Sequence, residues 1–416
     1  MRINHQKASS ENRKTGDPKP ETAVGCYFHI PFCARKCDYC RFLSFPFDGK
    51  TEERYTNAVL TELRLFNARL QTIPPVDSIY FGGGTPGLVP AEHITGILGE
   101  CRRVFPAAFD AEITLETNPG TVSPEKAAAY RAAGVNRVSL GAQSFSDAEL
   151  RMVGRIHSAE QIADSLAVLS GAGFDEISID LMLGLPKQTA ESWRATLETA
   201  VSFPIRHISV YMLELDEQSQ LLTRDTQGKP FIPGDDLVAD LYAETIDFLG
   251  RRGVKQYEIS NFARTGSASR HNLKYWRRIP VYGFGLGSHS FDGRFRYANV
   301  REIEDYCRRV ESGLSTLAWR SEVTEKQAIE ETFFLGLRLT DGVDLRSAAD
   351  GFDGFNGSNG SKDAVVDFLA ERGKILEEFR AGGLLDFNST DLSDLSRLRL
   401  TVKGMLLSNE VLEYFI

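Results

Sequence analysis

The sequence predicts an α/β fold: a partial (β/α)6 barrel of parallel strands, followed by a smaller C-terminal α/β accessory domain. Apolar runs of strand length alternate with helix-length segments, which is the pattern of parallel β/α units. Six such units fit into residues 25–213, whereas a closed eight-fold barrel usually needs about 250 residues. Glycines and polar residues follow directly after the expected strands, where such folds carry their chemistry.

The expected strands are short apolar runs that end at glycine, proline or polar residues. They are residues 25–30, 78–81, 112–116, 136–140, 176–182 and 207–213. The segments between them are predicted helices, and in the first of these Val59, Leu63 and Phe66 form an apolar stripe at helical spacing. The predicted helices are residues 52–70, 91–104, 124–133, 159–172 and 191–201, with another near 235–252.

Four parts of the chain differ in pattern. Residues 1–24 have no apolar core and are predicted to be a disordered polar tail, and residues 25–255 form the barrel. Residues 256–323 are a connecting segment, with a turn-rich stretch from 260 to 299, and residues 324–416 are the accessory domain, for which a winged-helix arrangement is one option. Within that domain, the Gly- and Ser-rich residues 351–361 indicate a flexible surface loop.

Charge and composition narrow the class of protein. The 416 residues are 42% hydrophobic and 25% charged, which is an ordinary globular balance. The net charge of −9 argues against a chain that coats nucleic acid, because such binding needs a basic surface. The sequence has neither an uncharged apolar run of about 18 residues nor a secretory signal, so a cytoplasmic location is expected.

Three of the six cysteines lie close together, as Cys33, Cys37 and Cys40. Clustered thiols in a chain without a secretory signal indicate metal ligands in a reducing compartment. Three thiolates can hold three irons of a [4Fe-4S] cluster and leave the fourth iron open to a substrate or cofactor. A structural zinc site is the alternative, with His29 as its fourth ligand, although this spacing is unusual for zinc.

This cysteine motif, followed by the loop Gly83-Gly84-Thr85-Pro86, resembles the radical S-adenosylmethionine (SAM) superfamily. The run from Tyr27 to Cys33 is similar to the group that contains HemN-like coproporphyrinogen oxidases and HemW-like haem chaperones. The resemblance extends to about Leu412. It implies that SAM binds the open iron, and that an electron from the cluster cleaves SAM to a 5′-deoxyadenosyl radical.

The resemblance also implies a set of cofactor-binding residues. Tyr39 should border the adenine, Arg155 the methionine carboxylate and Asp180 the ribose, while Glu116 should lie near the ammonium or the ribose. His289, in a glycine-rich turn, should flank the same pocket. The full set implied for SAM is Tyr27, Tyr39, Gly83, Gly84, Thr85, Glu116, Gln143, Arg155 and Asp180.

A second motif begins at Arg270 and reads Arg-His-Asn-Leu-Lys-Tyr-Trp. It resembles the His-Asn-x-x-Tyr-Trp motif of HemW-like haem chaperones, which implies haem binding. His271 would ligate the iron, and Tyr275 and Trp276 would offer flat faces to the porphyrin. Arg270 and the following Arg277 and Arg278 could pair with the propionates. The alternative is a loop histidine beside core aromatic residues.

The resemblance therefore predicts a haem chaperone that delivers haem to acceptor haemoproteins, among them membrane-bound respiratory enzymes, and that has an electron donor of unknown identity. Two features favour this function over a coproporphyrinogen III oxidase. Phe42 stands where the oxidases have a further cysteine, and the polar residues before Gly25 could not cover a porphyrinogen site. The coproporphyrinogen III oxidase remains the alternative function. A third possible function is that of a radical SAM enzyme with another substrate, such as a methyltransferase.

Overall fold

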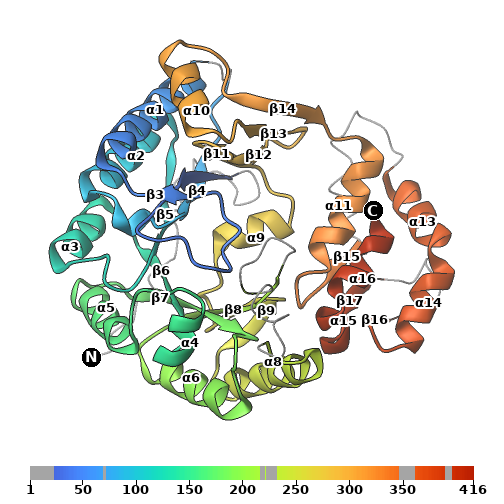
Figure 1. The fold of residues 1–416 in the computed structure, drawn as a ribbon. Helices are drawn as coiled ribbons and strands as arrows, with labels where there is room; N and C mark the ends of the chain where they lie inside the picture. Colours follow the sequence, from blue (N-terminus) through green and yellow to red (C-terminus); the bar gives the residue numbers. More distant parts are fainter. Residues whose placement is uncertain (1–22, 69–71, 216–220, 222–231, 346–360, 389–395) are drawn as a thin grey trace, which may run out of the picture.

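The structure is a computed structural model, and it describes residues 23–68, 72–215, 221, 232–345, 361–388 and 396–416. The predicted polar tail lies outside the described residues except for its last two, and so does the predicted loop 351–361 except for Ser361. Figure 1 shows strands enclosed by an outer ring of helices, with the last helices of the chain gathered on one side.

The central sheet confirms the predicted fold class. Its parallel strands include all six expected ones, and each is within a few residues of its predicted bounds. Buried apolar residues alternate with inward-facing polar residues along several of them, which is how a barrel with a polar interior is built. These strands are β1 (Val24–Ile30), β4 (Val76–Gly83), β5 (Ala107–Thr117), β6 (Arg137–Gln143), β7 (Glu176–Leu183) and β8 (His207–Met212).

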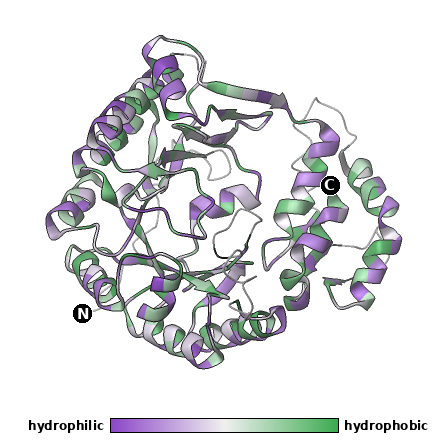
Figure 2. Ribbon diagram, in the orientation of Figure 1, coloured by the Kyte–Doolittle hydropathy of each residue, from purple (hydrophilic) through white to green (hydrophobic). Residues whose placement is uncertain are grey.

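The helices between these strands also follow the prediction. Ser123 caps one of them and precedes Pro124 at its first position, while Ser158 and Thr189 start capping boxes. Hydrophilic and hydrophobic residues are mixed along these helices, as expected when one face covers a sheet (Figure 2). They are α1 (Gly49–Asn67), α2 (Ala91–Val104), α3 (Pro124–Ala133), α5 (Ala159–Gly171), α6 (Ala190–Ser202) and α8 (Asp235–Gly250).

The stretch from 260 to 299 has the predicted turns, but between them it holds regular elements that the sequence analysis did not predict. The stretch holds β10 (Asn261–Ala263), α9 (Arg270–Trp276), β11 (Val281–Phe284), β12 (His289–Phe291) and β13 (Phe295–Asn299). Its glycines suggested turns, but the strands around them are short, mostly buried and paired with the sheet.

Residues 256–323, expected to connect two domains, therefore extend the barrel sheet at both ends. Strand β11 runs parallel to β1 as a seventh parallel strand. Strand β10 and then β9 (Lys255–Glu258) follow β8 at one edge, while β14 (Leu317–Glu322) forms the other. The result is a sheet of twelve strands in the order β14-β13-β12-β11-β1-β4-β5-β6-β7-β8-β10-β9.

The C-terminal part combines helices with a separate three-stranded antiparallel sheet, as an α/β accessory domain should. Phe333 stacks on Phe368 at 5.2 Å and on Phe415 at 5.6 Å between ring centroids, which ties the first and last helices of this part together. Its elements are α11 (Glu325–Gly336), β15 (Val343–Asp344), α13 (Ser361–Glu371), α14 (Gly373–Ala381), β16 (Leu385–Phe387), β17 (Arg397–Leu400), α15 (Val402–Leu406) and α16 (Ser408–Leu412). Among the described residues, no helix is both long enough and apolar enough to cross a membrane.

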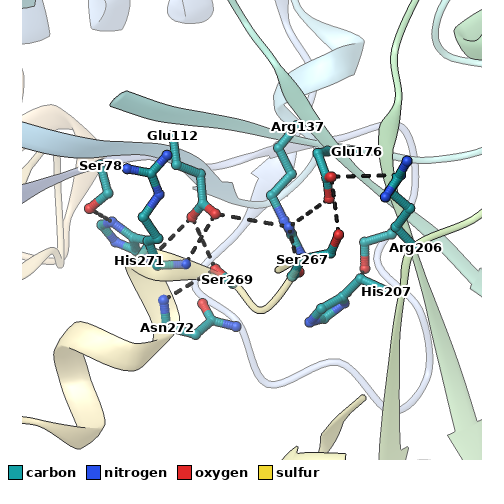
Figure 3. Close-up of polar contacts among 12 residues, drawn as sticks. Ser78, Glu112, Arg137, Glu176, Arg206, His207, Ser267, Ser269, His271 and Asn272 are labelled. Atoms are coloured by element: carbon teal, nitrogen blue, oxygen red, sulfur yellow. Dashed lines mark hydrogen bonds and ion pairs between the residues drawn. The ribbon is translucent and has the colours of Figure 1, made fainter. Parts of the chain in front are cut away.

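Helix α9 lies across the amino-terminal end of the barrel. Glu112, near the start of β5, accepts hydrogen bonds from the backbone N–H groups of Arg270 and His271, at 3.0 Å each (Figure 3). The buried Arg137 donates to the carbonyl of Ser267 at 2.9 Å and lies 3.6 Å from Glu176. These contacts join the strand starts to the helix, so α9 closes the barrel at the end opposite to the expected cofactor site.

Candidate functional site

The three clustered cysteines lie on one loop beside the carboxyl ends of β1 and β4. Cys33 ends the short strand β2 (Phe32–Cys33), which pairs with β3 (Phe45–Pro46), and the backbone N–H of Cys40 donates to the carbonyl of Cys37 at 3.1 Å. All three thiols are free and half-buried. Among the described residues, no three Cys, His, Asp or Glu side chains converge closely enough for a single metal ion.

The separation of the three thiols is compatible with a four-iron cluster. In such a cluster each cysteine binds a different iron, so the sulfur atoms need not meet at one point. Zinc needs four ligands around one ion. Its proposed fourth ligand, His29, has both ring nitrogens occupied, by the Tyr27 hydroxyl at 3.0 Å and the Leu43 carbonyl at 2.9 Å. The donor set therefore fits the cluster better than zinc.

A chain of polar contacts links the cysteine loop to the strand ends. The Thr85 hydroxyl lies 3.6 Å from the Cys33 sulfur and accepts a hydrogen bond from the Asn118 amide at 2.8 Å. Arg155 donates to Asn118 Oδ1 at 2.8 Å and lies 3.5 Å from the Cys37 sulfur. A half-buried guanidinium beside the Cys37 thiol suits an anionic ligand set. Sequence reasoning missed Asn118, although its position directly after β5 was a usable signal.

The loop after β4 is shaped by close backbone approach. Gly83 has φ +115°, a conformation that side-chain-bearing residues rarely adopt, and a Cβ there would lie 2.6 Å from the His29 ring. A Cβ on Gly84 would lie 2.7 Å from the Phe32 backbone. The Thr85 N–H donates to the Phe32 carbonyl at 2.8 Å, which holds the loop against the cysteine segment.

Replacing Gly83 with alanine should destabilise the fold by about 1–3 kcal/mol, because both the backbone conformation and the His29 ring oppose a Cβ. Gly99→Ala is the matched control, since Gly99 is inside helix α2 with open space around it and should gain about 0.5–1 kcal/mol. Urea denaturation of both variants measures the difference. Equal stabilities would contradict the described loop geometry.

Two half-buried carboxylates lie near the ends of β5 and β7. Glu116 accepts hydrogen bonds from the Tyr80 hydroxyl at 2.7 Å and the Gly83 N–H at 3.1 Å. Burial, reinforced by the charge of Asp180, raises the pKa of Glu116 to about 7. Burial also raises the pKa of Asp180, which accepts a hydrogen bond from Ser139 at 3.0 Å. Neither makes an ion pair with a described residue, so both suit a cationic or hydroxyl-bearing ligand.

The other residues predicted to bind SAM lie on the strands and loops around this edge. Tyr27 is on β1 with its hydroxyl on His29, and Gln143 ends β6 in a left-handed conformation at φ +68° with a buried side chain. Tyr39 packs with a small apolar group that includes Val153 and Met182. A groove beside the cysteine loop is lined by Cys37, Thr85, Asn118, Arg155 and their neighbours.

In the second motif, His271 and Tyr275 contact each other, whereas Trp276 packs against Arg338. His271 is buried against the barrel base, with Nδ1 3.0 Å from the Ser78 hydroxyl and Nε2 3.1 Å from the Tyr275 hydroxyl. Burial lowers the pKa of His271 to about 3. The ring of Tyr275 is 40% exposed, whereas Trp276 lies under the guanidinium of Arg338, 4.6 Å from its centroid.

This geometry differs from that of an open iron ligand. Both ring nitrogens of His271 already have partners, and the ring stacks on Tyr80 at 5.0 Å between centroids. Ser78 is near the start of β4, so His271 enters the barrel from its amino-terminal end, and its ring lies 6.5 Å from the Tyr27 ring between centroids. Ligation of haem by Nε2 of His271 stays a prediction that requires the hydrogen bond to Tyr275 to break, while the contact of Nδ1 with Ser78 could remain.

His289 lines a cavity apart from the groove at the cysteine loop. This cavity is shared with Tyr275 and is lined by none of the residues assigned to SAM. The expectation that His289 flanks the SAM pocket is therefore not supported by the groove and cavity linings.

Comparison with known proteins shows the family of the chain. The Radical SAM superfamily model matches residues 27–200. The chain is 34% identical to the heme chaperone HemW of Bacillus subtilis over 94% of this chain and 98% of the relative. It is 36% identical to the mitochondrial radical S-adenosyl methionine domain-containing protein 1 of Mus musculus over 78% and 76% of the two chains.

A solved structure shares nearly the whole fold. Coproporphyrinogen III oxidase HemN of Escherichia coli superimposes with a TM-score of 0.80 at 25% identity, over 95% of this chain and 91% of that one. The cysteine loop, the strand-end residues and the near full-length similarity all agree, and the chain belongs to the HemW family of the radical SAM superfamily.

Proposed function

We propose that this protein is a haem chaperone, which binds haem and transfers it to acceptor haemoproteins. The observation that carries the proposal is the similarity to the heme chaperone HemW along nearly the full length of both chains. Identity to these relatives is 32–34%, compared with 25% to the structurally matched oxidase HemN.

We further propose that the protein holds a [4Fe-4S] cluster and SAM at the carboxyl edge of the barrel. Cys33, Cys37 and Cys40 would ligate three irons, and when bound the cluster and SAM supply one-electron reductive chemistry. Arg155 would pair with the methionine carboxylate of SAM. Glu116 and Asp180 support this assignment, because two partly buried carboxylates without an ion-pair partner among the described residues suit a cationic or hydroxyl-bearing ligand.

The second candidate function is oxygen-independent coproporphyrinogen III oxidase. The observation that favours it is the TM-score of 0.80 to HemN. Phe42 argues against it, because it occupies the position of the additional oxidase cysteine and its side chain is 68% exposed. Fold alone does not decide between them, since one fold can serve several functions.

The partners of this proposal are haem, an acceptor haemoprotein, and a one-electron donor to the cluster. Membrane-bound respiratory enzymes are the proposed class of acceptor, and the cytoplasm is the proposed location. His271 of the second motif is the iron ligand that the resemblance implies, and its Nε2 would have to leave Tyr275 to serve as one.

Anaerobic reconstitution with iron and sulfide, followed by haem titration, tests the proposal. The reconstituted protein should bind haem and pass it to an apo-haemoprotein. The transfer rate should rise with acceptor concentration, because direct delivery requires an encounter of the two proteins. Capture of haem by apomyoglobin after passive release is the control, and its rate should not depend on acceptor concentration.

The same reconstituted protein, supplied with SAM, reductant and an electron acceptor, should not convert coproporphyrinogen III to protoporphyrinogen IX. HemN of Escherichia coli is the positive control. Multiple-turnover conversion by this chain would refute the chaperone function and establish the oxidase. Failure to bind haem at all would also refute it.

A further inference from the structure

A cavity of about 350 Å³ lies between α9, the strands β11 to β13 and α11. Its volume is in the range of small-molecule sites. Phe291, Phe334 and Leu335 give it apolar walls, and Tyr275 contributes a half-exposed ring. No cysteine and no residue assigned to SAM lines it. The cavity is therefore lined separately from the predicted cofactor site.

His289 differs from the other described histidines. His29, His207 and His271 each have both ring nitrogens in hydrogen bonds. His93 and His157 each have one partner, a carboxylate and a carbonyl respectively. His289 makes no hydrogen bond with the described residues, and it is exposed on the cavity side. Partial burial, together with Arg301 and Arg296, lowers its pKa, so its ring is neutral near pH 7 and keeps a free lone pair.

The cavity also carries excess positive charge. Glu331 accepts hydrogen bonds from Arg278 at 2.8 Å and from Arg296 at 2.5 Å. Both guanidiniums face the ring of Phe291, at 5.3 Å and 4.6 Å from its centroid. One carboxylate therefore balances two cations, and Nη2 of Arg278 is buried without a hydrogen-bond partner.

Arg278 also occupies a position that normally favours glycine. It follows the end of α9 with φ +52°, and its N–H donates to the Tyr275 carbonyl while the Ile279 N–H donates to the Lys274 carbonyl. These two bonds form a Schellman motif, whose left-handed residue is usually glycine. An arginine there costs backbone strain, which indicates that its side chain is needed in the cavity.

We propose that this cavity is the haem site, with His289 as the iron ligand and with Arg278 and Arg296 facing the propionate carboxylates. The inference rests on the proposed haem binding and deepens it. Imidazole is a common haem ligand, and guanidinium groups pair well with carboxylates. Phe291 and Phe334 provide the apolar contact that a flat macrocycle needs.

Titration of the full chain with ferric haem, followed by absorbance, separates the two candidate ligands. His289→Ala should weaken haem binding by at least about tenfold, corresponding to about 1.4 kcal/mol, or replace the histidine-ligated spectrum. His271→Ala should leave the spectrum as in the unmodified protein. His93→Ala is the matched control for loss of a partly exposed histidine outside the cavity.

Quenching of tryptophan fluorescence gives an independent readout of position. The Trp319 ring lies 5.9 Å from the His289 ring, so bound haem should quench it strongly. Trp319→Phe should therefore remove a large share of the quenching signal. Undiminished quenching in that variant would contradict this location.

Arg278→Gly tests the carboxylate contact without threatening the fold, because glycine suits the left-handed conformation. Thermal stability should be unchanged or higher. The preference for haem over haem dimethyl ester, which lacks the carboxylate charges, should fall by about fivefold or more. An unchanged preference would overturn the role of Arg278.

The outcomes separate the inference from the function on which it rests. Haem binding that survives His289→Ala but is lost in His271→Ala would overturn the inference and leave the proposed chaperone intact. Absence of haem binding by the unmodified chain would defeat both. Loss of haem binding in His289→Ala, with the cluster and the thermal stability both retained, supports haem binding in this cavity.

Discussion

Cys37→Ala should abolish the four-iron cluster in anaerobically reconstituted protein. The variant keeps two of the three thiols on the loop, and two thiolates leave two irons without a protein ligand. Iron and sulfide content and the broad visible absorbance should both fall to near background. The same result is expected for Cys33→Ala and Cys40→Ala, because the three thiols form one ligand set.

Cys101→Ala and Cys307→Ala are the matched controls. Both thiols are buried, in α2 and in α10 (Ile303–Glu311), and both belong to the hydrophobic core. These variants should lose some stability through the smaller side chain and still bind a full cluster. Full iron loading of Cys37→Ala would refute the cluster assignment, and loss of the cluster in both controls would show that the assay reports folding.

Glu116→Gln should weaken SAM binding by about tenfold or more near pH 8, and the loss should shrink as the pH falls. Glu116 has a pKa of about 7 in the folded chain, compared with 4.5 for the unperturbed carboxyl. One pH unit below 7, roughly a tenth of the carboxyl is ionised, so its attraction for the positive charge of SAM is largely lost. Equilibrium binding of SAM between about pH 6 and pH 8 measures the change.

Ionisation of Glu116 has opposite effects on SAM binding and on folding. As the pH rises, it should strengthen SAM binding but lower the stability of the ligand-free fold. Because the folded chain binds more protons than the unfolded chain between pH 4.5 and 7, Glu116 makes the ligand-free fold less stable as the pH rises through this interval. Glu116→Gln should remove that slope and make the ligand-free protein as stable or more stable at pH 8.

Glu62→Gln is the matched control for this prediction. Burial also raises the pKa of Glu62, but its hydrogen bonds go to Gly285 and Tyr306, away from the SAM residues. The amine of SAM titrates equally in all three proteins, so the difference between variants reports the protein carboxyl. An identical pH dependence in Glu116→Gln and the unmodified chain would contradict a carboxylate contact with SAM.

Much of the barrel could be predicted because its information is local. The strand at 112–116 is a run of alternating apolar residues, and the helix at 124–133 begins at a Ser-Pro cap and ends before a left-handed glycine. The short strands β11, β12 and β13 could not be predicted in this way, because three to five residues with adjacent glycines gain their stability from pairing across the sheet.

The sequence by itself determined the parallel β/α order, the cysteine triad and the residues at the carboxyl ends of the strands. These are properties of spacing, and every parallel strand delivers its last residues to the same edge. Only the tertiary structure decided that His271 is buried against Ser78 and that His289 faces an open cavity with Arg278. The sequence alone cannot distinguish the two histidines. Burial and hydrogen-bond partners determine whether a ring nitrogen is free, and both depend on strands and helices that are distant in the chain.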